Sequence, residues 1–271
     1  MSGRPRGPVV VRGGGDMATA AAHRLWRAGL EVVILERAAP TAIRRAAAFA
    51  EAVFEGQATV EGVTATRCAD VAEARALLER GGAMPLLVDP EAHAVKELAP
   101  VAVVDARMLK DDPGPRPAGA GLLVGLGPGF VAGKSCDLVV ETERGHTLGR
   151  VIERGAPLPY SGVPGAIDGE TVRRVLRAPA EGTLKARAAI GDLVAAGACL
   201  CEVEGVACAA TVGGVVRGLL RDGSHVTAGQ KIGDVDPRGA AVDPAVIGDK
   251  ARAIAGGVLE AILGRLSGRI S

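Results

Sequence analysis

The sequence predicts an α/β protein, with a Rossmann-like, doubly wound parallel sheet followed by a small all-β barrel-sandwich and a C-terminal helix. Three observations predict this class. Strand-like and helix-like segments alternate between residues 9 and 104. A segment of short strands repeats itself at an offset of 32 residues between residues 178 and 235. The last segment has apolar residues at helical spacing from Ile247 to Leu266.

The first elements form one βαβ unit around a glycine turn. Residues 9–11 are a short β-branched run that enters Gly13–Gly15, and residues 17–28 have helix-forming composition closed by Gly29. Residues 31–36 then predict a second buried strand. Strand, turn and helix therefore follow one another in the order of a dinucleotide-binding unit.

The alternation continues beyond this unit. We expect the following elements: a helix from Thr41 to about Phe54, a strand at 60–66, a helix at 70–80, a strand at 86–88, a short helix near 92–98 and a strand at 101–104. The Pro/Gly-rich residues 111–121 predict a loop. Further strands are expected after it, at 122–124, 138–141 and 148–152.

The repeat predicts the all-β part. Six residues recur at the offset of 32, namely Gly182, Gly191, Val194, Gly197, Leu200 and Val203 as Gly214, Gly223, Val226, Gly229, Ile232 and Val235. Two such halves would form a flattened β-barrel. The predicted domains are thus 1–118, Rossmann-like and nucleotide-binding; 119–170, strands and a glycine-rich loop that complete or flank the sheet; 171–238, the barrel; and 239–271, a helix that packs back.

Composition excludes several classes of protein. The chain has 32 Lys+Arg against 31 Asp+Glu and only five aromatic residues, so nucleic-acid binding is disfavoured. No apolar run reaches the ~20 residues of a membrane helix, and the N-terminus lacks the hydrophobic region of a signal peptide. An odd number of cysteines without CxxC spacing predicts free thiols. We expect a cytoplasmic protein with no membrane partner.

The glycine turn is the main candidate binding site. Gly13-Gly14-Gly15-Asp16-Met17-Ala18 fits G-x-G-x-x-G/A between a strand and a helix, where a pyrophosphate would meet backbone N–H groups. Glu36 ends the second strand, where an acidic side chain can accept from a ribose hydroxyl. Arg37, Arg44 and Arg45 lie close enough in the sequence to accommodate a 2′-phosphate, so the sequence does not distinguish NAD from NADP. The alternative is a tight turn without a ligand.

Polar residues after other strands are weaker candidates. Asp105 and Lys110 could transfer a proton or bind an anion at the carboxyl edge, and His146 lies in a predicted turn between two strands. For each of them the alternative is a solvated loop or turn residue. No metal-ligand spacing is present. Residues 127–135 end in Gly-Lys-Ser, but Pro128 stands where a P-loop needs Gly, and a strand is expected next rather than a helix.

Four cysteines have no assigned role from the sequence, namely Cys136, Cys199, Cys201 and Cys208. We expect the cysteines of the repeat to fill small apolar spaces. A sulfur or metal site is the alternative there, and Cys136 beside Lys134 could have a lowered pKa.

The repeated segment resembles the biotinyl/lipoyl hammerhead domain, with paired G-D-x-V-x-x-G turns. Those carriers hold their prosthetic group on a lysine in the hairpin between the halves. Here that hairpin, residues 202–208, has no lysine, and none occurs between Lys185 and Lys231. The resemblance therefore implies a barrel without covalent biotin or lipoate, reused for docking or oligomerisation.

The whole chain resembles the selenium-dependent molybdenum hydroxylase accessory protein family, also called the YqeB family. The segments that carry this resemblance are Arg12–Thr19 with His23–Leu25, Ala42–Arg45, Glu51–Val53, Val104–Ala106, Gly125–Phe130, Glu141, Arg144–His146, Leu148–Arg150 and Gly256–Ala261. The resemblance implies a Rossmann domain followed by a hammerhead and an association with the maturation of molybdenum hydroxylases.

These observations favour a nucleotide-binding accessory (maturation) protein of a molybdenum hydroxylase system. NAD(P) or a molybdopterin dinucleotide would bind at Gly13–Ala18 through its pyrophosphate, and the partner would be a hydroxylase or another maturation factor. The alternatives are an NAD(P)-dependent oxidoreductase and a scaffold without bound nucleotide. The sequence is also compatible with a homo-oligomer.

Overall fold

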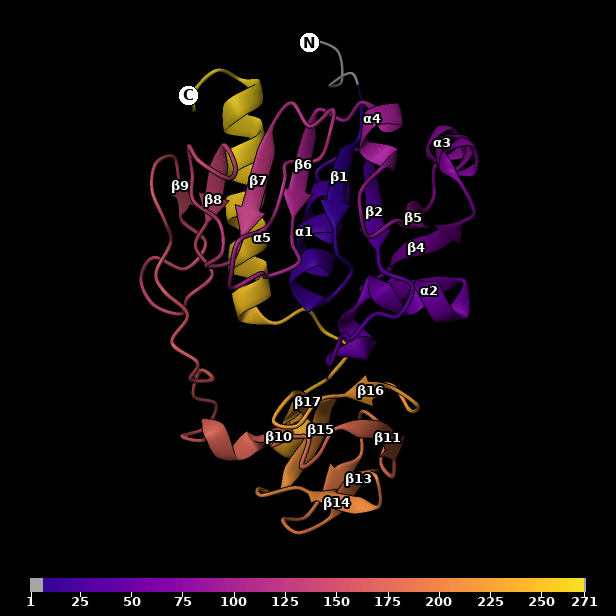
Figure 1. The fold of residues 1–271 in the computed structure, drawn as a ribbon, viewed down its shortest axis with the longest axis vertical. Helices are drawn as coiled ribbons and strands as arrows, with labels where there is room; N and C mark the ends of the chain where they lie inside the picture. The colour runs from indigo at the N-terminus through magenta and orange to yellow at the C-terminus, as the bar shows by residue number, and fades with distance from the viewer. Residues whose placement is uncertain (1–6, 271) are drawn as a thin grey trace. The chain divides into compact units, whose positions relative to one another are not determined.

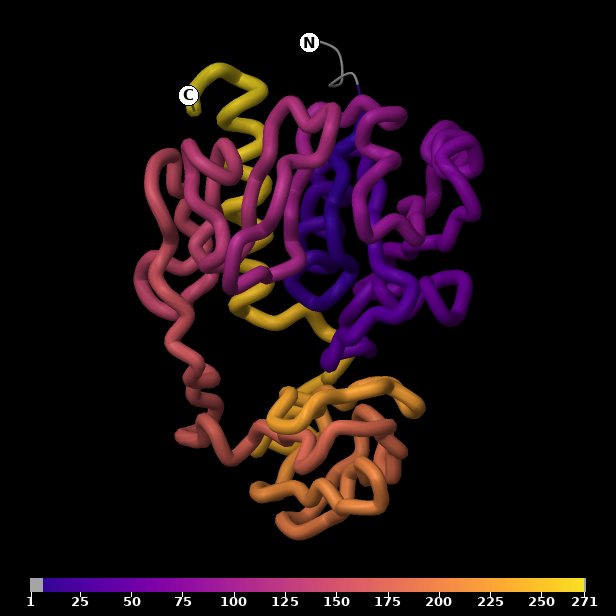
Figure 2. Tube along the Cα trace, in the orientation of Figure 1, coloured from indigo at the N-terminus to yellow at the C-terminus, as the bar shows by residue number. Residues whose placement is uncertain are grey.

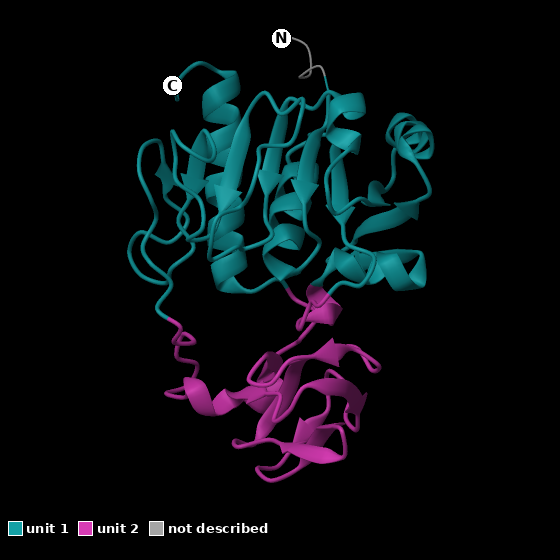
Figure 3. Ribbon diagram, in the orientation of Figure 1, with its two compact units in different colours: residues 1–40, 48–161, 247–271 teal, residues 41–47, 162–246 magenta. Residues whose placement is uncertain are grey.

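The protein folds into two compact units (Figure 3). The computed structural model describes residues 7–270. Unit 1 contains residues 7–40, 48–161 and 247–270 of this range, and unit 2 contains residues 41–47 and 162–246. The chain therefore enters unit 2 twice and returns to unit 1 for its last helix, a path that Figure 2 traces.

Unit 1 is built on a nine-stranded sheet. Its strands are β1 (Val9–Arg12), β2 (Val32–Glu36), β3 (Gln57–Val60), β4 (Val63–Cys68), β5 (Met84–Val88), β6 (Ala102–Asp105), β7 (Leu123–Leu126), β8 (Leu138–Val140) and β9 (Val151–Ile152). Their order is β3-β4-β5-β2-β1-β6-β7-β8-β9. The strands from β4 to β8 run parallel, whereas β3 and β9 pair antiparallel at the two edges. The predicted parallel sheet is confirmed.

Helices cover both faces of the central strands. One face carries α1 (Asp16–Arg27) and α5 (Asp249–Leu266), which lie side by side, and the other carries α3 (Val71–Arg80) and α4 (Ala94–Leu98) (Figure 1). Every residue of β1 is buried, as expected of a parallel strand covered on both faces. No helix among residues 7–270 has the length and apolar content needed to span a bilayer.

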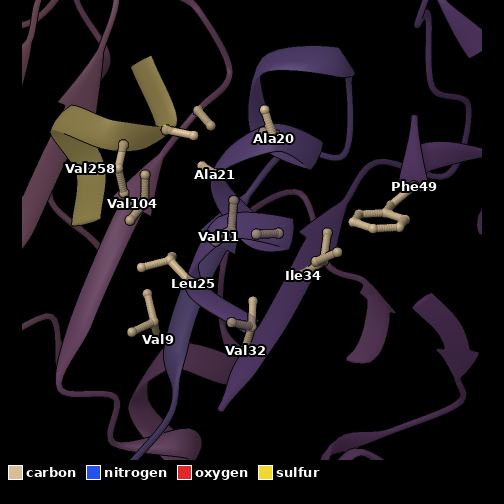
Figure 4. Close-up of a cluster of buried hydrophobic side chains, with 14 of the residues drawn as sticks. Val9, Val11, Ala20, Ala21, Leu25, Val32, Ile34, Phe49, Val104 and Val258 are labelled. Atoms are coloured by element: carbon tan, nitrogen blue, oxygen red, sulfur yellow. The ribbon is translucent and has the colours of Figure 1, made fainter. Parts of the chain in front are cut away.

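The core on the α1/α5 face is made of small and branched side chains. Val11 of β1, Val104 of β6, Leu25 of α1 and Val258 of α5 belong to one cluster (Figure 4). Small residues let α5 approach the loop before β9 closely. A Cβ added at Gly257 would lie 2.0 Å from the carbonyl oxygen of Gly149.

Two predicted elements differ in the structure. Instead of one helix from Thr41 to Phe54, there are 3-10 turns at Arg45–Ala47 and Phe49–Glu51 and a short α2 (Ala52–Glu55). The helix is interrupted because the Ile43 carbonyl accepts from Leu219 N at 2.9 Å and Ala48 is extended. The predicted strand at 60–66 is the β3–β4 hairpin, whose turn residues Glu61 and Gly62 have φ of +46° and +77°.

Unit 2 consists mainly of two four-stranded antiparallel sheets. The first orders β10 (Val175–Arg177), β17 (Lys231–Asp236), β15 (Gly214–Leu219) and β12 (Leu193–Val194); the second orders β14 (Val206–Ala209), β13 (Cys199–Val203), β11 (Gly182–Ala186) and β16 (His225–Val226). They enclose one apolar cluster, so the predicted small all-β unit is confirmed. At the hairpin between β13 and β14, the Glu204 carboxylate accepts from Thr183 N at 2.9 Å.

The contact between α5 and the loop before β9 predicts opposite effects for two adjacent glycines. Gly257→Ala should lower the free energy of unfolding by about 1–3 kcal/mol, because the added methyl group meets the Gly149 carbonyl. Gly256→Ala is the matched control, since its Cβ would meet nothing within 4 Å and should stabilise the helix by about 0.5–1 kcal/mol. Urea unfolding followed by Trp26, the single tryptophan and a residue of α1, reports on unit 1. Equal effects of the two variants would contradict this close approach.

Candidate functional site

The candidate site lies at the carboxyl edge of the parallel strands in unit 1. β1 is flanked by β2 on one side and by β6 on the other, so the connections after β1 and β6 lead away in opposite directions. Ligands of open α/β sheets bind in the crevice at such a switch point. The glycine turn follows β1, and the loop that contains Lys110 follows β6.

The three glycines of the turn have different surroundings. Gly13 has a φ of +101°, which favours glycine. A Cβ at Gly14 would lie 2.9 Å from Ala50 N, which itself donates to the Gly14 carbonyl at 2.9 Å. A Cβ at Gly15 would meet nothing within 4 Å, and Gly15 has a φ of −66°. The fold therefore requires glycine at the first two positions, while at Gly15 the turn is open.

The open position is the start of α1. Gly15 is the N-cap residue, and as a glycine it has no side chain that could cap the first N–H groups of the helix. Uncapped N–H groups at a helix N-terminus favour an anion, through hydrogen bonds and the helix dipole. Asp16, in the first turn, adds a negative charge beside them.

Glu36 lies against the glycine turn. Its Oε2 accepts from Gly14 N at 2.7 Å, and its Oε1 accepts from Arg37 N at 2.7 Å. The half-buried carboxylate thus holds the turn to the end of β2. Each oxygen keeps a second lone pair, so acceptance from a ribose hydroxyl is still a prediction for this residue.

Asp105 is engaged by two arginines. It is 1% exposed, and its Oδ2 accepts from Arg12 Nη1 at 3.1 Å and Arg107 Nη2 at 2.7 Å. Its Oδ1 accepts from the Arg107 side-chain Nε at 2.8 Å and backbone N at 3.3 Å. With all four lone-pair positions used, we assign Asp105 a structural role. Burial lowers the pKa of Arg12, and Asp105 opposes that effect.

The other two sequence candidates are exposed. Lys110 lies on the loop after β6, with its Nζ 4.0 Å from the centroid of the Tyr160 ring. His146 lies in the turn between β8 and β9 and makes no hydrogen bond or ion pair with any residue of the described chain. The structure brings Lys110, but not His146, into contact with another side chain at this edge.

Two residues of this edge were not proposed as site residues from the sequence. Glu141 follows β8 and is 3% exposed, and its carboxylate accepts from Glu143 N at 2.7 Å and Leu158 N at 2.8 Å. Lys250 lies in the first turn of α5, half-buried, and within residues 7–270 it forms no hydrogen bond or ion pair. Glu141 stood within the family resemblance. For Lys250 the only signal was its position near the start of the last helix.

Lys250 has an unusual electrostatic environment. Burial lowers its pKa, and the charges around it are those of Glu143, Arg144, Asp16 and Glu141. Arg144 is itself paired with Asp249, at 2.9 and 3.1 Å. The Lys250 ammonium therefore stands near several carboxylates without contacting them, and its N–H groups can serve a ligand.

The Gly-Lys-Ser segment lies away from this edge. Ser135 Oγ accepts from Val131 N at 2.9 Å in a tight turn, and β8 follows at Leu138, which confirms the predicted strand. The segment lines a pocket of about 520 Å³ together with Arg116 and Asp137. The suggestion that Cys136 has a lowered pKa was wrong, because burial raises the pKa of this thiol to about 11.

The cysteines of unit 2 are free thiols. Cys201 and Cys208 face each other across β13 and β14. Burial raises the pKa of Cys201 to about 12, and it also raises that of Cys208. Across the described residues, no group of three or more His, Cys, Asp or Glu side chains could hold a metal ion.

Comparison with known proteins identifies a homologue. The chain is 50% identical over 255 residues to the protein named "Uncharacterized protein YqeB" of Escherichia coli (strain K12), a match that covers 94% of this chain and 47% of YqeB. The chain thus spans about half the length of that relative. No family model matches.

Solved structures give only distant similarities. The ectoine utilization protein EutE of Ruegeria pomeroyi is 13% identical, with a TM-score of 0.27 over 84% of this chain and 85% of EutE. A succinylglutamate desuccinylase/aspartoacylase from Rhodobacter sphaeroides is 15% identical, with a TM-score of 0.27 over 86% of each chain. A likeness this low supports no inference about activity.

The interactions of Asp105 predict a large effect on stability. Asp105→Ala should lower the free energy of unfolding by about 3–5 kcal/mol, because Arg12, 6% exposed, would lose its buried counter-charge. Asp111→Ala is the matched control, since Asp111 is exposed on the same loop. Urea unfolding followed by Trp26 fluorescence measures both variants. An Asp105→Ala protein as stable as the control would show that the ion pair does not support the sheet.

Proposed function

The chain is a homologue of YqeB over 94% of its length, and we propose that it is a nucleotide-binding accessory protein of a molybdenum hydroxylase system. The observation that supports nucleotide binding is the open space beside Gly15 at the start of α1. The association with molybdenum hydroxylases comes from the family resemblance of the sequence. NAD(P) and a molybdopterin dinucleotide both carry the pyrophosphate that such a turn recognises.

The residues around Gly15 fit a pyrophosphate. A phosphate oxygen can approach the start of α1 because Gly15, at the N-cap position, carries no side chain that would occupy this space. Lys250, which forms no hydrogen bond or ion pair within residues 7–270, supplies a cation near Asp16. A charge-assisted hydrogen bond from this lysine would contribute about 1.5–3 kcal/mol to binding.

The carboxylates of the edge favour a dinucleotide over a nucleoside triphosphate. Asp16 and Glu36 both lie at the glycine turn. Each repels a highly charged triphosphate, whereas the pyrophosphate diester of a dinucleotide carries fewer charges and brings ribose hydroxyls that can donate to Glu36. Selection therefore combines attraction at Gly15 and Lys250 with repulsion from the acidic side chains.

The proposed partner is a hydroxylase or another maturation factor. Unit 2 supports a docking role, because its hairpin carries Glu204 and Gly205 rather than a lysine that could bear a prosthetic group. An NAD(P)-dependent oxidoreductase is the alternative that uses the same turn. Reduction or oxidation of added nicotinamide cofactor by the purified protein would favour that alternative.

A thermal-shift panel with NAD, NADP, ATP, CTP, GTP and a molybdopterin dinucleotide tests the proposal. A ligand at 100 times its Kd adds about 2.7 kcal/mol of stability. Gly15→Val should abolish the shift without unfolding the protein, since its side chain projects into open space. Lys250→Met should weaken binding about tenfold or more and leave the ligand-free protein at least as stable, because it removes a half-buried charge.

Lys134→Met is the matched control for Lys250→Met. Lys134 is exposed and lies in the turn before β8, away from the glycine turn, so its loss should leave the shift unchanged. If no nucleotide stabilises the wild-type protein, the binding proposal fails and a scaffold without nucleotide is favoured. A shift that survives in Gly15→Val would place the ligand elsewhere.

A further inference from the structure

A short segment crosses the carboxyl edge of the sheet beside the candidate site. We call residues 157–161, which follow β9, the edge strap. Leu158 N donates to the buried Glu141 carboxylate at 2.8 Å, and Ser161 Oγ donates to Glu143 Oε1 at 3.2 Å. These bonds fix the strap to the loop after β8, with Tyr160 between the two anchored residues.

Tyr160 is the most exposed aromatic residue of the chain. It is the single tyrosine and is 54% exposed, against 39% for Phe54, whereas Phe49 and Phe130 are fully buried and Trp26 packs on the core. The Lys110 ammonium covers the ring at 4.0 Å from its centroid, a cation–π contact. An exposed ring held between two anchors and backed by a cation is a ready surface for a second planar ring.

The ring belongs to the same edge as the glycine turn. Ser161 donates to Glu143 on the loop after β8, and the charges of Glu143 and of Asp16, at the start of α1, both act on Lys250. Lys110 follows β6, the strand on the other side of the switch point from Glu36 and β2. A dinucleotide bound at a switch point extends its two halves to either side of the pyrophosphate. Glu36 lies on one side, and Tyr160 with Lys110 lies on the other.

We propose that Tyr160 and Lys110 form a ring platform that binds the planar nitrogen heterocycle on the β6–β8 side of the nucleotide. The inference rests on the proposed function, because it assigns one half of the same ligand. The heterocycle stacks on Tyr160, and the Lys110 cation holds the tyrosine ring in place. Stacking tolerates different rings, so a nicotinamide, a nucleobase or a pterin fits the same platform.

Variants at Tyr160 separate stacking from phosphate binding. Tyr160→Leu should weaken the binding of NAD or a molybdopterin dinucleotide about ten- to a hundredfold, the range expected for loss of one stacked ring. Tyr160→Phe keeps the ring and should bind within about threefold of wild type. Leu158→Ala is the control on the same strap, since Leu158 is half-exposed and holds the strap through its backbone N–H. Isothermal titration calorimetry measures each affinity.

Inorganic pyrophosphate distinguishes this platform from the glycine turn. It carries no ring, so Tyr160→Leu should bind it as wild type does, whereas Gly15→Val should not. Stacking should also quench the emission of Tyr160, the single tyrosine. The nucleotide that loses most affinity in Tyr160→Leu identifies the ring among the three sources.

The outcomes distinguish the two proposals. Unchanged dinucleotide affinity in Tyr160→Leu overturns the platform alone and makes the strap an ordinary surface loop. Equal losses for pyrophosphate and dinucleotide in Tyr160→Leu also overturn it, because the variant would then act on the phosphate site. Wild-type protein that binds neither pyrophosphate nor any dinucleotide overturns the proposed function and the platform with it.

Discussion

The ion pair between Arg12 and Asp105 joins the ends of the two central strands where their connections diverge. Both side chains are buried, so the desolvation of each charge is offset only while the other is present. Arg107 adds a second cation to Asp105 and turns the loop after β6. The glycine turn begins directly after Arg12, and the loop that carries Lys110 begins after Asp105. The positions of both parts of the candidate site therefore depend on this pair.

Around this pair, backbone N–H groups donate hydrogen bonds to the acidic side chains of the edge. Glu36 accepts from Gly14, and Glu141 accepts from Leu158, so each carboxylate fixes a loop. The two lysines of the edge have different surroundings from these carboxylates. Within residues 7–270, Lys250 forms no ion pair with a carboxylate, and Lys110 lies on an aromatic ring. An edge of this kind can bind an anion even though the net charge of the whole chain is only +1.

Local pattern predicted the parts of the fold that depend on neighbouring residues. The strand, glycine turn and helix from Val9 to Arg27 were confirmed because β-branched residues, glycine and helix formers follow one another there. The repeat predicted the all-β unit. The prediction of one helix from Thr41 to Phe54 was wrong, because the Ile43 carbonyl accepts a hydrogen bond from Leu219 N, a residue far away in the sequence. The lowered pKa of Lys250 and the raised pKa of Cys136 both result from burial in the folded chain, which the local sequence does not reveal.

An NMR titration of the backbone amides with NAD and with a molybdopterin dinucleotide tests directly whether the glycine turn binds a nucleotide. The amide signals of Gly15, Asp16 and Met17 should shift together and saturate with one ligand bound. The Lys250 side-chain signal should shift at the same ligand concentration. Shifts confined to the pocket around Arg116 and Lys134, or no saturable shift at the glycine turn, would show that no nucleotide binds at Gly15.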